Sequence, residues 1–127
     1  TSDYAPEMIN AAKKSESYSC FVSRNSKIPF IVMPDAINAI TELMASDKKK
    51  LKSNVYNITS FSPTVTEFYD EIIKYYKKFK MTYNINIKRQ NIINSWPKLL
   101  DDSLAVCEWG WKPKYNFKAA FKNYLFL

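Results

Sequence analysis

The most informative stretch of the chain is Asn94-Ser95-Trp96-Pro97, followed by Leu100-Asp101-Asp102-Ser103 and by Glu108-Trp109-Gly110-Trp111-Lys112-Pro113. Asp101 or Asp102 can cap a helix that runs to about Glu108, because a short acidic side chain accepts hydrogen bonds from the free amides of a first helical turn. Gly110 suits the end of that helix, since glycine adopts the left-handed conformation without steric cost. The stretch therefore predicts a loop, a short capped helix and a sharp turn.

These motifs resemble the C-terminal part of the NAD-dependent L-threonine 3-dehydrogenases of the extended short-chain dehydrogenase/reductase type. In that family an Arg-Gln-x-x-x-x-Ser-Trp-Pro segment lies near the substrate pocket, and residues 89–97 keep its spacing. Other segments match the family in the same order and cover almost the whole chain: Thr1-Ser2-Asp3-Tyr4-Ala5, Tyr18-Ser19-Cys20-Phe21, Met33-Pro34-Asp35-Ala36 and Val55-Tyr56-Asn57-Ile58. The resemblance implies that residues 1–127 are the C-terminal, substrate-binding portion of a longer NAD-dependent epimerase/dehydratase-like protein.

Glycine is scarce in this sequence. The 127 residues contain one glycine, Gly110, where average usage is about 7%. Dinucleotide-binding folds need several glycines where the backbone approaches a pyrophosphate. The Rossmann half is therefore expected to lie upstream and to hold the NAD, with none bound by this chain alone. The start at Thr1, inside a family motif, points the same way.

Composition excludes several classes of site. The chain has no histidine, and Cys20 and Cys107 have no metal-ligand spacing, so we expect neither a metal site nor a histidine-based triad. We expect both cysteines to be reduced thiols, as is usual in an intracellular compartment, here cytoplasmic or mitochondrial. No apolar run approaches the roughly 18 residues of a membrane span, so no membrane partner is expected.

The net charge of +7 raises the question of nucleic acid. The densest basic runs are 48–52 and 77–80, and the second coincides with the last turn of a predicted helix, where cations are favoured. Single charge runs of this kind are typical of solvated surface. We therefore expect no nucleic-acid partner and keep a basic binding module as the least favoured alternative.

Hydrophobic periodicity predicts a mixture of helices and strands, hence an α/β fold, or α+β if the chain is taken alone. Helices are expected at 4–14 and at 116–125. Another is expected to begin at Asp35, with an apolar face of Ala36, Ile37, Ile40, Leu43 and Met44. A further helix is expected at 64–76, where Thr64-Val65-Thr66-Glu67 forms a capping box. Strands are expected at 18–22, 28–32, 55–59 and 81–87. By the resemblance, 55–59 joins a parallel sheet whose other strands lie outside this chain, which leaves unpaired edges here.

Four residues are candidates for substrate binding. Arg89 has a guanidinium fork suited to a carboxylate or a phosphate; the alternative is a surface arginine paired with Asp101 or Asp102. Trp96 can pack over a small substrate and exclude water, or serve as a core anchor. Thr1 and Ser2 match the paired threonines that line the family's substrate pocket.

The catalytic residues are expected outside this chain. The resembled family uses a Tyr-x-x-x-Lys pair, in which the lysine lowers the pKa of the tyrosine that accepts the alcohol proton. Tyr76 and Lys80 have this spacing, but they lie on a predicted amphipathic helix without a Ser or Thr partner. Trp109 and Trp111 are expected to be packing residues.

The resemblance implies an oxidoreductase that converts L-threonine to 2-amino-3-ketobutyrate with NAD, of which this chain is the substrate side and by itself inactive. The partner is then a small amino-acid substrate, and the full-length protein is expected to be a homodimer. The main alternative is a nucleotide-sugar epimerase or dehydratase of the same superfamily, in which Arg89 would bind a diphosphate. The segment Ser95-Trp96-Pro97 argues against that alternative, because a sugar nucleotide needs room at this place.

Overall fold

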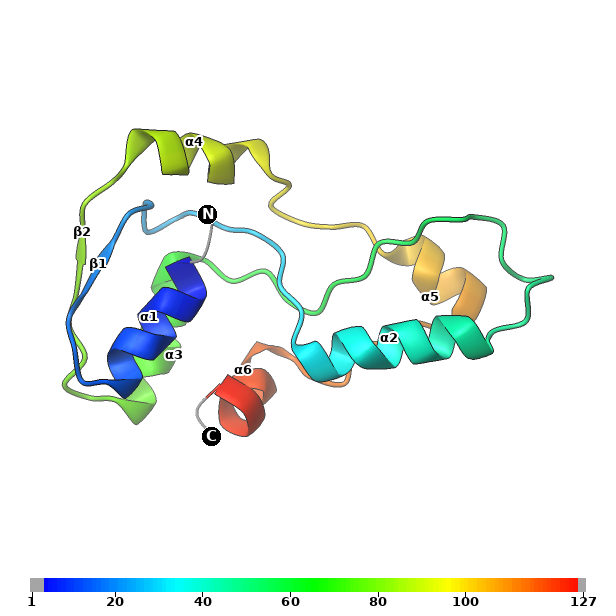
Figure 1. The fold of residues 1–127 in the computed structure, drawn as a ribbon, viewed down its shortest axis with the longest axis horizontal. Helices are drawn as coiled ribbons and strands as arrows, with labels where there is room; N and C mark the ends of the chain where they lie inside the picture. Colours follow the sequence, from blue (N-terminus) through cyan, green and yellow to red (C-terminus); the bar gives the residue numbers. More distant parts are fainter. Residues whose placement is uncertain (1–3, 126–127) are drawn as a thin grey trace.

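Helices dominate the secondary structure of the computed structural model, which describes residues 4–125 (Figure 1). In chain order the elements are α1 Tyr4–Lys13, β1 Tyr18–Cys20, α2 Met33–Ala45, α3 Val65–Tyr75, β2 Met81–Tyr83, α4 Ile87–Ser95, α5 Ser103–Trp109, α6 Phe117–Ala120 and a π-helix at Phe121–Leu125. Helices with a small parallel sheet confirm the predicted fold class.

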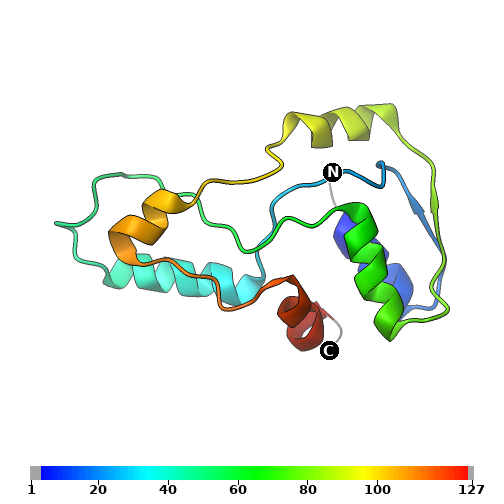
Figure 2. The same cartoon turned by 180° about the vertical axis from the view of Figure 1, so that it is seen from behind.

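Two lobes are visible in Figure 1 and, from behind, in Figure 2. The first lobe contains α1, β1, α3, β2, α4 and α6. The second lobe contains α2, α5 and the long connection at 46–60, and it extends away from α1 and α3. Each lobe has its own cluster of buried apolar residues.

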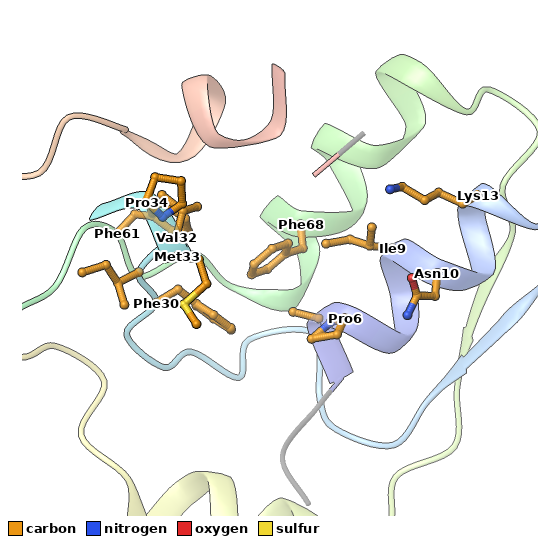
Figure 3. Close-up of a pocket in the computed structure, with 12 residues that line it drawn as sticks. Pro6, Ile9, Asn10, Lys13, Phe30, Val32, Met33, Pro34, Phe61 and Phe68 are labelled. Atoms are coloured by element: carbon orange, nitrogen blue, oxygen red, sulfur yellow. The ribbon is translucent and has the colours of Figure 1, made fainter. Parts of the chain in front are cut away.

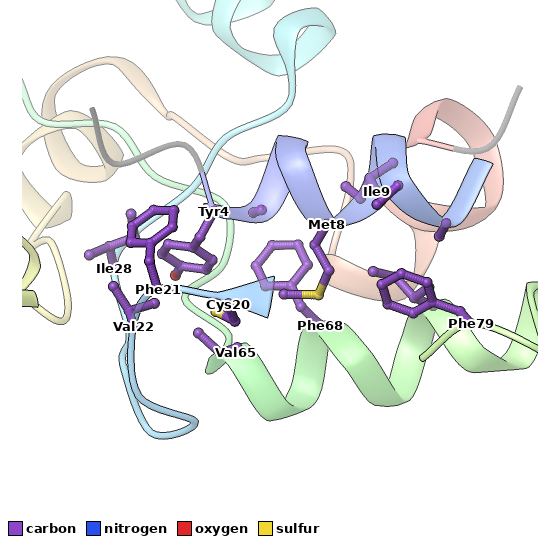
Figure 4. Packing of buried hydrophobic residues seen from close by; sticks show 14 of the residues in the cluster. Tyr4, Met8, Ile9, Cys20, Phe21, Val22, Ile28, Val65, Phe68 and Phe79 are labelled. Carbon is purple, nitrogen blue, oxygen red and sulfur yellow. The ribbon is translucent and has the colours of Figure 1, made fainter. Parts of the chain in front are cut away.

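The first lobe has an aromatic core between α1 and α3 (Figure 4). Tyr4 and Met8 of α1 are fully buried and lie against Phe68 of α3. The Tyr4 and Phe68 rings meet edge to face with centroids 6.4 Å apart, an arrangement that the aromatic quadrupole favours. Burial of one such side chain contributes about 2–3 kcal/mol, so this core fixes the position of α1.

The sheet of the first lobe is one parallel pair. Strand β1 pairs with β2 in the register Tyr18–Met81, Ser19–Thr82 and Cys20–Tyr83. Two further backbone hydrogen bonds follow the pair, from the Asn84 amide to the Cys20 carbonyl and from the Asn86 amide to the Phe21 carbonyl, each 2.9 Å long. They bring the start of α4 next to the end of β1.

The second lobe is organised around a buried carboxylate. Asp35, on the first turn of α2, is fully buried. Its carboxylate accepts hydrogen bonds from the Ser60 hydroxyl at 3.2 Å, the Lys114 amide at 3.0 Å and the Tyr115 amide at 3.1 Å. A buried charge is tolerated when hydrogen bonds replace its hydration. Asp35 therefore links α2 to Ser60, in the connection before α3, and to Lys114 and Tyr115, in the segment before α6.

The start of α3 confirms the capping box that the sequence predicted. The Thr64 hydroxyl accepts from the Glu67 amide at 3.2 Å, and the Glu67 carboxylate accepts from the Thr64 amide at 2.6 Å. Both halves of the predicted capping box are thus present. Val65, Phe68 and Ile72 of the predicted apolar stripe are buried.

Helix α5 was also predicted at its two ends. Asp102 occupies the N-cap position without a side-chain cap bond, while the Asp101 carboxylate accepts from the Ser103 amide at 3.0 Å. Gly110 ends the helix at φ 77°. Among the described residues the other positive φ belongs to Ser15, at 59°, just beyond α1.

The strand predicted at 28–32 is wrong, whereas the strand at 55–59, whose partners were expected outside this chain, stays a prediction. Residues 28–32 form a single antiparallel bridge between Phe30 and Phe61, and 55–59 form no strand in the described structure. A strand needs a neighbour for its backbone groups, and residues 4–125 supply none beyond that bridge. Val55, predicted to be buried, is 75% exposed.

The predicted apolar face of α2 is turned outward, which is a further correction. Ile37, Ile40 and Met44 are exposed, and the side of the helix packed against the protein carries Asp35 and Ala39. The periodicity is that of a helix, as predicted. The structure differs because hydrogen bonds to Asp35, rather than apolar packing, orient the helix.

The region predicted as a strand at 81–87 ends early. Only Met81–Tyr83 pairs, and the expected buried side is exposed, since Tyr83, Ile85 and Ile87 are all open to solvent. Ile87 instead begins α4, a helix without an apolar stripe that the sequence pattern did not indicate; Ile93 is its buried residue. The final predicted helix is present as α6 and the π-helix.

Candidate functional site

Arg89 lies on the first turn of α4, above the end of β1. The Asn86 side chain caps this helix by accepting a hydrogen bond from the Arg89 amide at 3.1 Å. The guanidinium carbon stands 3.2 Å from the centre of the Phe21 ring. Stacking on an aromatic face holds a guanidinium in a fixed plane and contributes about 1 kcal/mol. The Arg89 side chain remains 29% exposed, so it is held and still reachable.

Glu7 of α1 forms an ion pair with Arg89. Its carboxylate lies 3.5 Å from Arg89 Nη2 and accepts a hydrogen bond from the Tyr18 hydroxyl at 2.9 Å. Burial and then this hydrogen bond raise the pKa of Tyr18 far above its ordinary value, which keeps the phenol protonated. Sequence reasoning named Asp101 and Asp102 as partners and missed Glu7, which is 82 residues away along the chain.

A shallow polar pocket of about 340 Å³ opens around this pair, lined by Glu7, Ser19, Phe21, Asn84, Ile85, Asn86 and Arg89. Its lining contains the ion pair of Arg89 and Glu7 together with the side chains of Ser19, Asn84 and Asn86. A guanidinium binds a carboxylate or phosphate through paired N–H donors. The pocket can therefore hold a small polar molecule that carries a carboxylate, provided that this carboxylate competes with Glu7 for Arg89.

Gln90, the second residue of the Arg-Gln motif, has a structural part that the sequence did not reveal. Its carbonyl accepts from the Ser23 amide at 2.7 Å, and its amide donates to the Ser26 hydroxyl at 3.0 Å. These bonds tie α4 to the 23–26 loop. This anchor and the Asn86 cap together hold Arg89 over the Phe21 ring.

Arg89 and Trp96 are the predicted substrate residues within the described part of the chain, and the structure does not bring these two together. Trp96 is 45% exposed one residue beyond α4, roughly 10 Å along the helix from Arg89 at 1.5 Å per residue, and it is not among the residues that line the Arg89 pocket. Trp96 is therefore not a core residue within the described part of the chain. Thr1 and Ser2 lie outside the described residues.

Trp109 and Trp111 are packing residues, as predicted. Trp111 is 1% exposed in the second cluster, and the two indole rings have centroids 5.8 Å apart. Tyr56 packs edge to face on Trp109 and donates a short hydrogen bond to Glu108. This group supports α5 and lies in the other lobe from Arg89.

The single glycine of the chain, Gly110, ends α5. Glycine suits this position because of its backbone angle, φ 77°. It is not required by lack of space, since an added Cβ would meet no atom within 4 Å. It therefore makes no close approach of the kind a pyrophosphate requires. Within residues 4–125 no group of His, Cys, Asp and Glu side chains could hold a metal ion, and no helix is long and apolar enough to cross a membrane.

Comparison with known proteins gives relatives over nearly the whole chain, although no protein-family model matches. An uncharacterized epimerase/dehydratase of Staphylococcus saprophyticus is 37% identical over 96% of this chain and 38% of its own length. The mitochondrial L-threonine 3-dehydrogenase of Sus scrofa is 34% identical over 91% of this chain and 31% of its own length. Among solved structures, the GalE-like L-threonine dehydrogenase from Cupriavidus necator has a TM-score of 0.91 at 35% identity, with 98% of this chain and 40% of that chain covered.

The fold extends to epimerases as well. The ADP-L-glycero-D-manno-heptose-6-epimerase of Helicobacter pylori has a TM-score of 0.70 at 19% identity, which shows a shared fold and no more. The chain is thus a homologue of one portion of the epimerase/dehydratase proteins, with part of the extended short-chain dehydrogenase/reductase fold. Within this class its relatives include L-threonine 3-dehydrogenases, so the predicted resemblance is confirmed. The chain spans 31–40% of the length of these relatives, which is consistent with the predicted C-terminal portion.

Proposed function

We propose that residues 1–127 form the substrate-binding portion of an NAD-dependent dehydrogenase that oxidises L-threonine to 2-amino-3-ketobutyrate. The observation that carries this proposal is the identity of 34–35% to L-threonine dehydrogenases over 91–98% of the chain. The NAD, the proton-accepting tyrosine and its lysine are supplied by the rest of the protein. By itself the chain binds the amino acid weakly and does not turn it over.

Arg89 is the residue that we assign to the substrate carboxylate. Its guanidinium is already oriented by the Phe21 ring and is partly exposed at the polar pocket. A preoriented cation loses little conformational entropy when it binds an anion. Glu7 lines the same pocket beside Arg89, and its carboxylate is suited to the ammonium group of an amino acid. An α-amino acid carries these two charges side by side.

Trp96, Thr1 and Ser2 complete the proposed substrate side. Trp96 is half exposed and can cover a bound amino acid only when the segment after α4 closes toward the pocket. Thr1 and Ser2, which precede α1 in the sequence, would offer hydroxyl groups to the substrate. These three roles rest on the family resemblance.

The test is NADH formation by the product of the complete gene, with L-threonine compared against UDP-glucose and a no-substrate control. We expect threonine-dependent reduction of NAD. Arg89→Ala should raise the KM for threonine roughly 10- to 100-fold, because a charged hydrogen bond to the carboxylate is lost. Trp96→Ala should lower turnover. Lys88→Ala, at an exposed neighbouring position on α4, is the control and should leave both constants unchanged.

A nucleotide-sugar epimerase or dehydratase is the second candidate, because the staphylococcal relative of 37% identity carries that description. In that case the complete protein fails to oxidise threonine but binds UDP-glucose, and Arg89→Ala weakens this binding by removing a diphosphate contact. If the complete protein neither oxidises threonine nor binds UDP-glucose, both candidate functions are wrong.

We further propose a homodimer for the full-length protein and an intracellular location, cytoplasmic or mitochondrial. The mitochondrial relative from Sus scrofa supports the second of these compartments. No nucleic-acid partner is proposed, since the basic residues at 48–52 lie on an exposed connection without interleaved aromatic side chains.

A further inference from the structure

The carboxylate of Glu7 is held at both of its oxygens. Oε2 accepts the hydrogen bond from the Tyr18 hydroxyl at 2.9 Å, and Oε1 lies 3.5 Å from Arg89 Nη2. These two partners come from β1 and α4, whereas Glu7 belongs to the first turn of α1. The Glu7 side chain is 43% exposed, and an ion pair of this length and exposure contributes little to stability. A role toward a ligand therefore accounts for the arrangement better than a role in folding.

The charges that line the polar pocket around Arg89 cancel. Glu7 and Arg89 are the charged residues among those that line it, and the others are polar or apolar. An anionic ligand that approaches the guanidinium also meets the neighbouring carboxylate, and like charges at such a distance repel each other. An amino-acid zwitterion brings one charge of each sign and so matches both side chains. The pocket thus favours a zwitterion over an anion of the same size.

A larger groove offers no such pairing. It has a volume of about 480 Å³, lies between α1 and the segment 30–34, and is lined mainly by apolar side chains such as Pro6, Ile9 and Phe30 (Figure 3). Lys13 is the charged residue among those that line it, and its described lining includes no carboxylate. An ammonium group would meet a cation there and no anion. Within the described part of the chain, the polar pocket is therefore the better site for an amino acid.

Tyr18 contacts Glu7 without lining the pocket itself. Its side chain is partly buried against the core of the first lobe, and the pairing of β1 with β2 fixes its backbone. Burial and then the bond to Glu7 raise the pKa of Tyr18, so its hydroxyl stays protonated and remains a donor. Tyr18 thus holds one oxygen of the Glu7 carboxylate and thereby orients the other toward Arg89.

We propose that Glu7 determines the class of ligand, by admitting an amino-acid zwitterion and disfavouring anions such as a deaminated acid or a diphosphate, and that Tyr18 positions it. The inference rests on the proposed function, in which the substrate is an amino acid. On binding, the substrate carboxylate takes its place at Arg89 and the substrate ammonium at Glu7. The contact of 3.5 Å between the two side chains is at the long limit of a hydrogen bond, so it is weak enough to be exchanged. Such specificity combines a repulsive element with an attractive one.

The test compares L-threonine with the R enantiomer of 3-hydroxybutanoate, which keeps the carboxylate and the hydroxyl group and lacks the ammonium. Both are titrated calorimetrically into the product of the complete gene, with NADH in place of NAD so that no oxidation occurs. Glu7→Gln keeps the size of the side chain and an acceptor oxygen for Tyr18 while it removes the charge. Tyr18→Phe removes the hydroxyl group alone. Glu16→Gln makes the matched change at an exposed position outside the pocket and is the control.

We expect Glu7→Gln to weaken L-threonine binding roughly 10- to 100-fold, because a hydrogen bond between two charged groups is lost. The same variant should bind the hydroxy acid more tightly, by roughly 3-fold or more, because the repulsion between two carboxylates is removed. Tyr18→Phe should weaken L-threonine binding by roughly 3- to 10-fold, and Glu16→Gln should change neither constant. Opposite effects on two ligands of similar size cannot arise from a loss of folding.

Two outcomes in a protein that forms NADH with L-threonine overturn the inference while the proposed function stands. They are equal losses of binding for both ligands in Glu7→Gln, and no change for either. If L-threonine yields no NADH, the proposed function fails, and the titrations still decide the inference. UDP-glucose binding that Arg89→Ala abolishes, or no binding of L-threonine, then overturns it. L-threonine binding that Glu7→Gln weakens, with tighter binding of the hydroxy acid, upholds it.

Discussion

The first lobe and the second lobe are held together by different chemistry. In the first, Tyr4, Met8, Phe21 and Phe68 interlock in an aromatic and aliphatic core. In the second, Ala39, Ala105 and Trp111 make a small cluster, and the buried Asp35 links the pieces by hydrogen bonds. The first lobe thus buries most apolar side chains of α1 and α3 within the described chain. The second turns most of those on α2 outward.

This difference teaches that apolar pattern and burial need not coincide within a part of a protein. A helix is positioned by whichever of its faces finds partners, and α2 finds them through Asp35 and Ala39. Its larger apolar side chains then remain for other contacts. The lobes should accordingly respond differently to the same kind of substitution.

The largest contrast is expected from core truncations. Phe68→Ala removes a ring that is 2% exposed and contacts Tyr4, Phe30 and Phe117. It should lower the free energy of unfolding by about 3–5 kcal/mol. Ile37→Ala, at a side chain 61% exposed, should change it by less than about 0.5 kcal/mol in this chain. Urea denaturation followed by circular dichroism measures both, and similar losses would contradict the contrast.

Substitution of Asp35 should have the largest effect within the second lobe. Asp35→Ala leaves the Ser60 hydroxyl and the amides of Lys114 and Tyr115 without their acceptor, at a cost of about 3 kcal/mol. Asp35→Asn keeps one acceptor oxygen and should cost about half as much. Fluorescence of Trp109 and Trp111, in a Trp96→Phe background, reports this lobe selectively. Unchanged emission and stability in Asp35→Ala would show that the apolar cluster alone holds the lobe.

Helix caps offer a smaller and matched comparison. Thr64→Ala removes the capping box of α3 and should cost about 1 kcal/mol, with Thr64→Ser restoring most of it. Asp102→Ala, at the N-cap position of α5 where no side-chain cap bond exists, should cost little. Equal losses measured by thermal unfolding would mean that the two helix starts are stabilised alike.

Acid should loosen the second lobe by a modest amount. The hydrogen bond from Tyr56, followed by that from the Lys52 amide, lowers the pKa of Glu108 below its ordinary value. A lowered folded-state pKa adds stability above the unfolded-state pKa of about 4.3, and this is lost as the pH falls through the folded-state value. Trp109 fluorescence should therefore change below about pH 4.3, and Glu108→Gln should abolish the change. A step that persists in Glu108→Gln belongs to another carboxylate.

The elements that sequence predicted best carry local signals. The capping box fixes the start of α3, and Gly110 fixes the end of α5, because both act through neighbouring residues. The strand predicted at 28–32 is wrong for the opposite reason, since strand pairing depends on a partner that can be distant in the sequence. The strand at 55–59 stays a prediction, because its expected partners lie outside this chain. Helix α4 was missed because its apolar residues follow no stripe and its start depends on the Asn86 cap.

The candidate site was predictable in part. Arg89 was singled out from its motif, but its partners Glu7 and Phe21 come from elements distant in sequence. Local pattern gives no signal for such pairs, apart from the general tendency of an acidic residue to occupy a first helical turn. Trp96 was likewise singled out from its motif. Its exposure could not be predicted, because it depends on how the segment after α4 leaves the helix.

The end of α1 carries a consequence for engineering. Ser15 adopts φ 59° there, a left-handed conformation that costs a non-glycine residue roughly 1–2 kcal/mol. The bond from the Glu16 amide to the Ala11 carbonyl at 2.9 Å closes the helix around it. Ser15 is thus a site of backbone strain next to the end of α1. Ser15→Gly would relieve it, and a more heat-resistant form of the chain could be built from that one position.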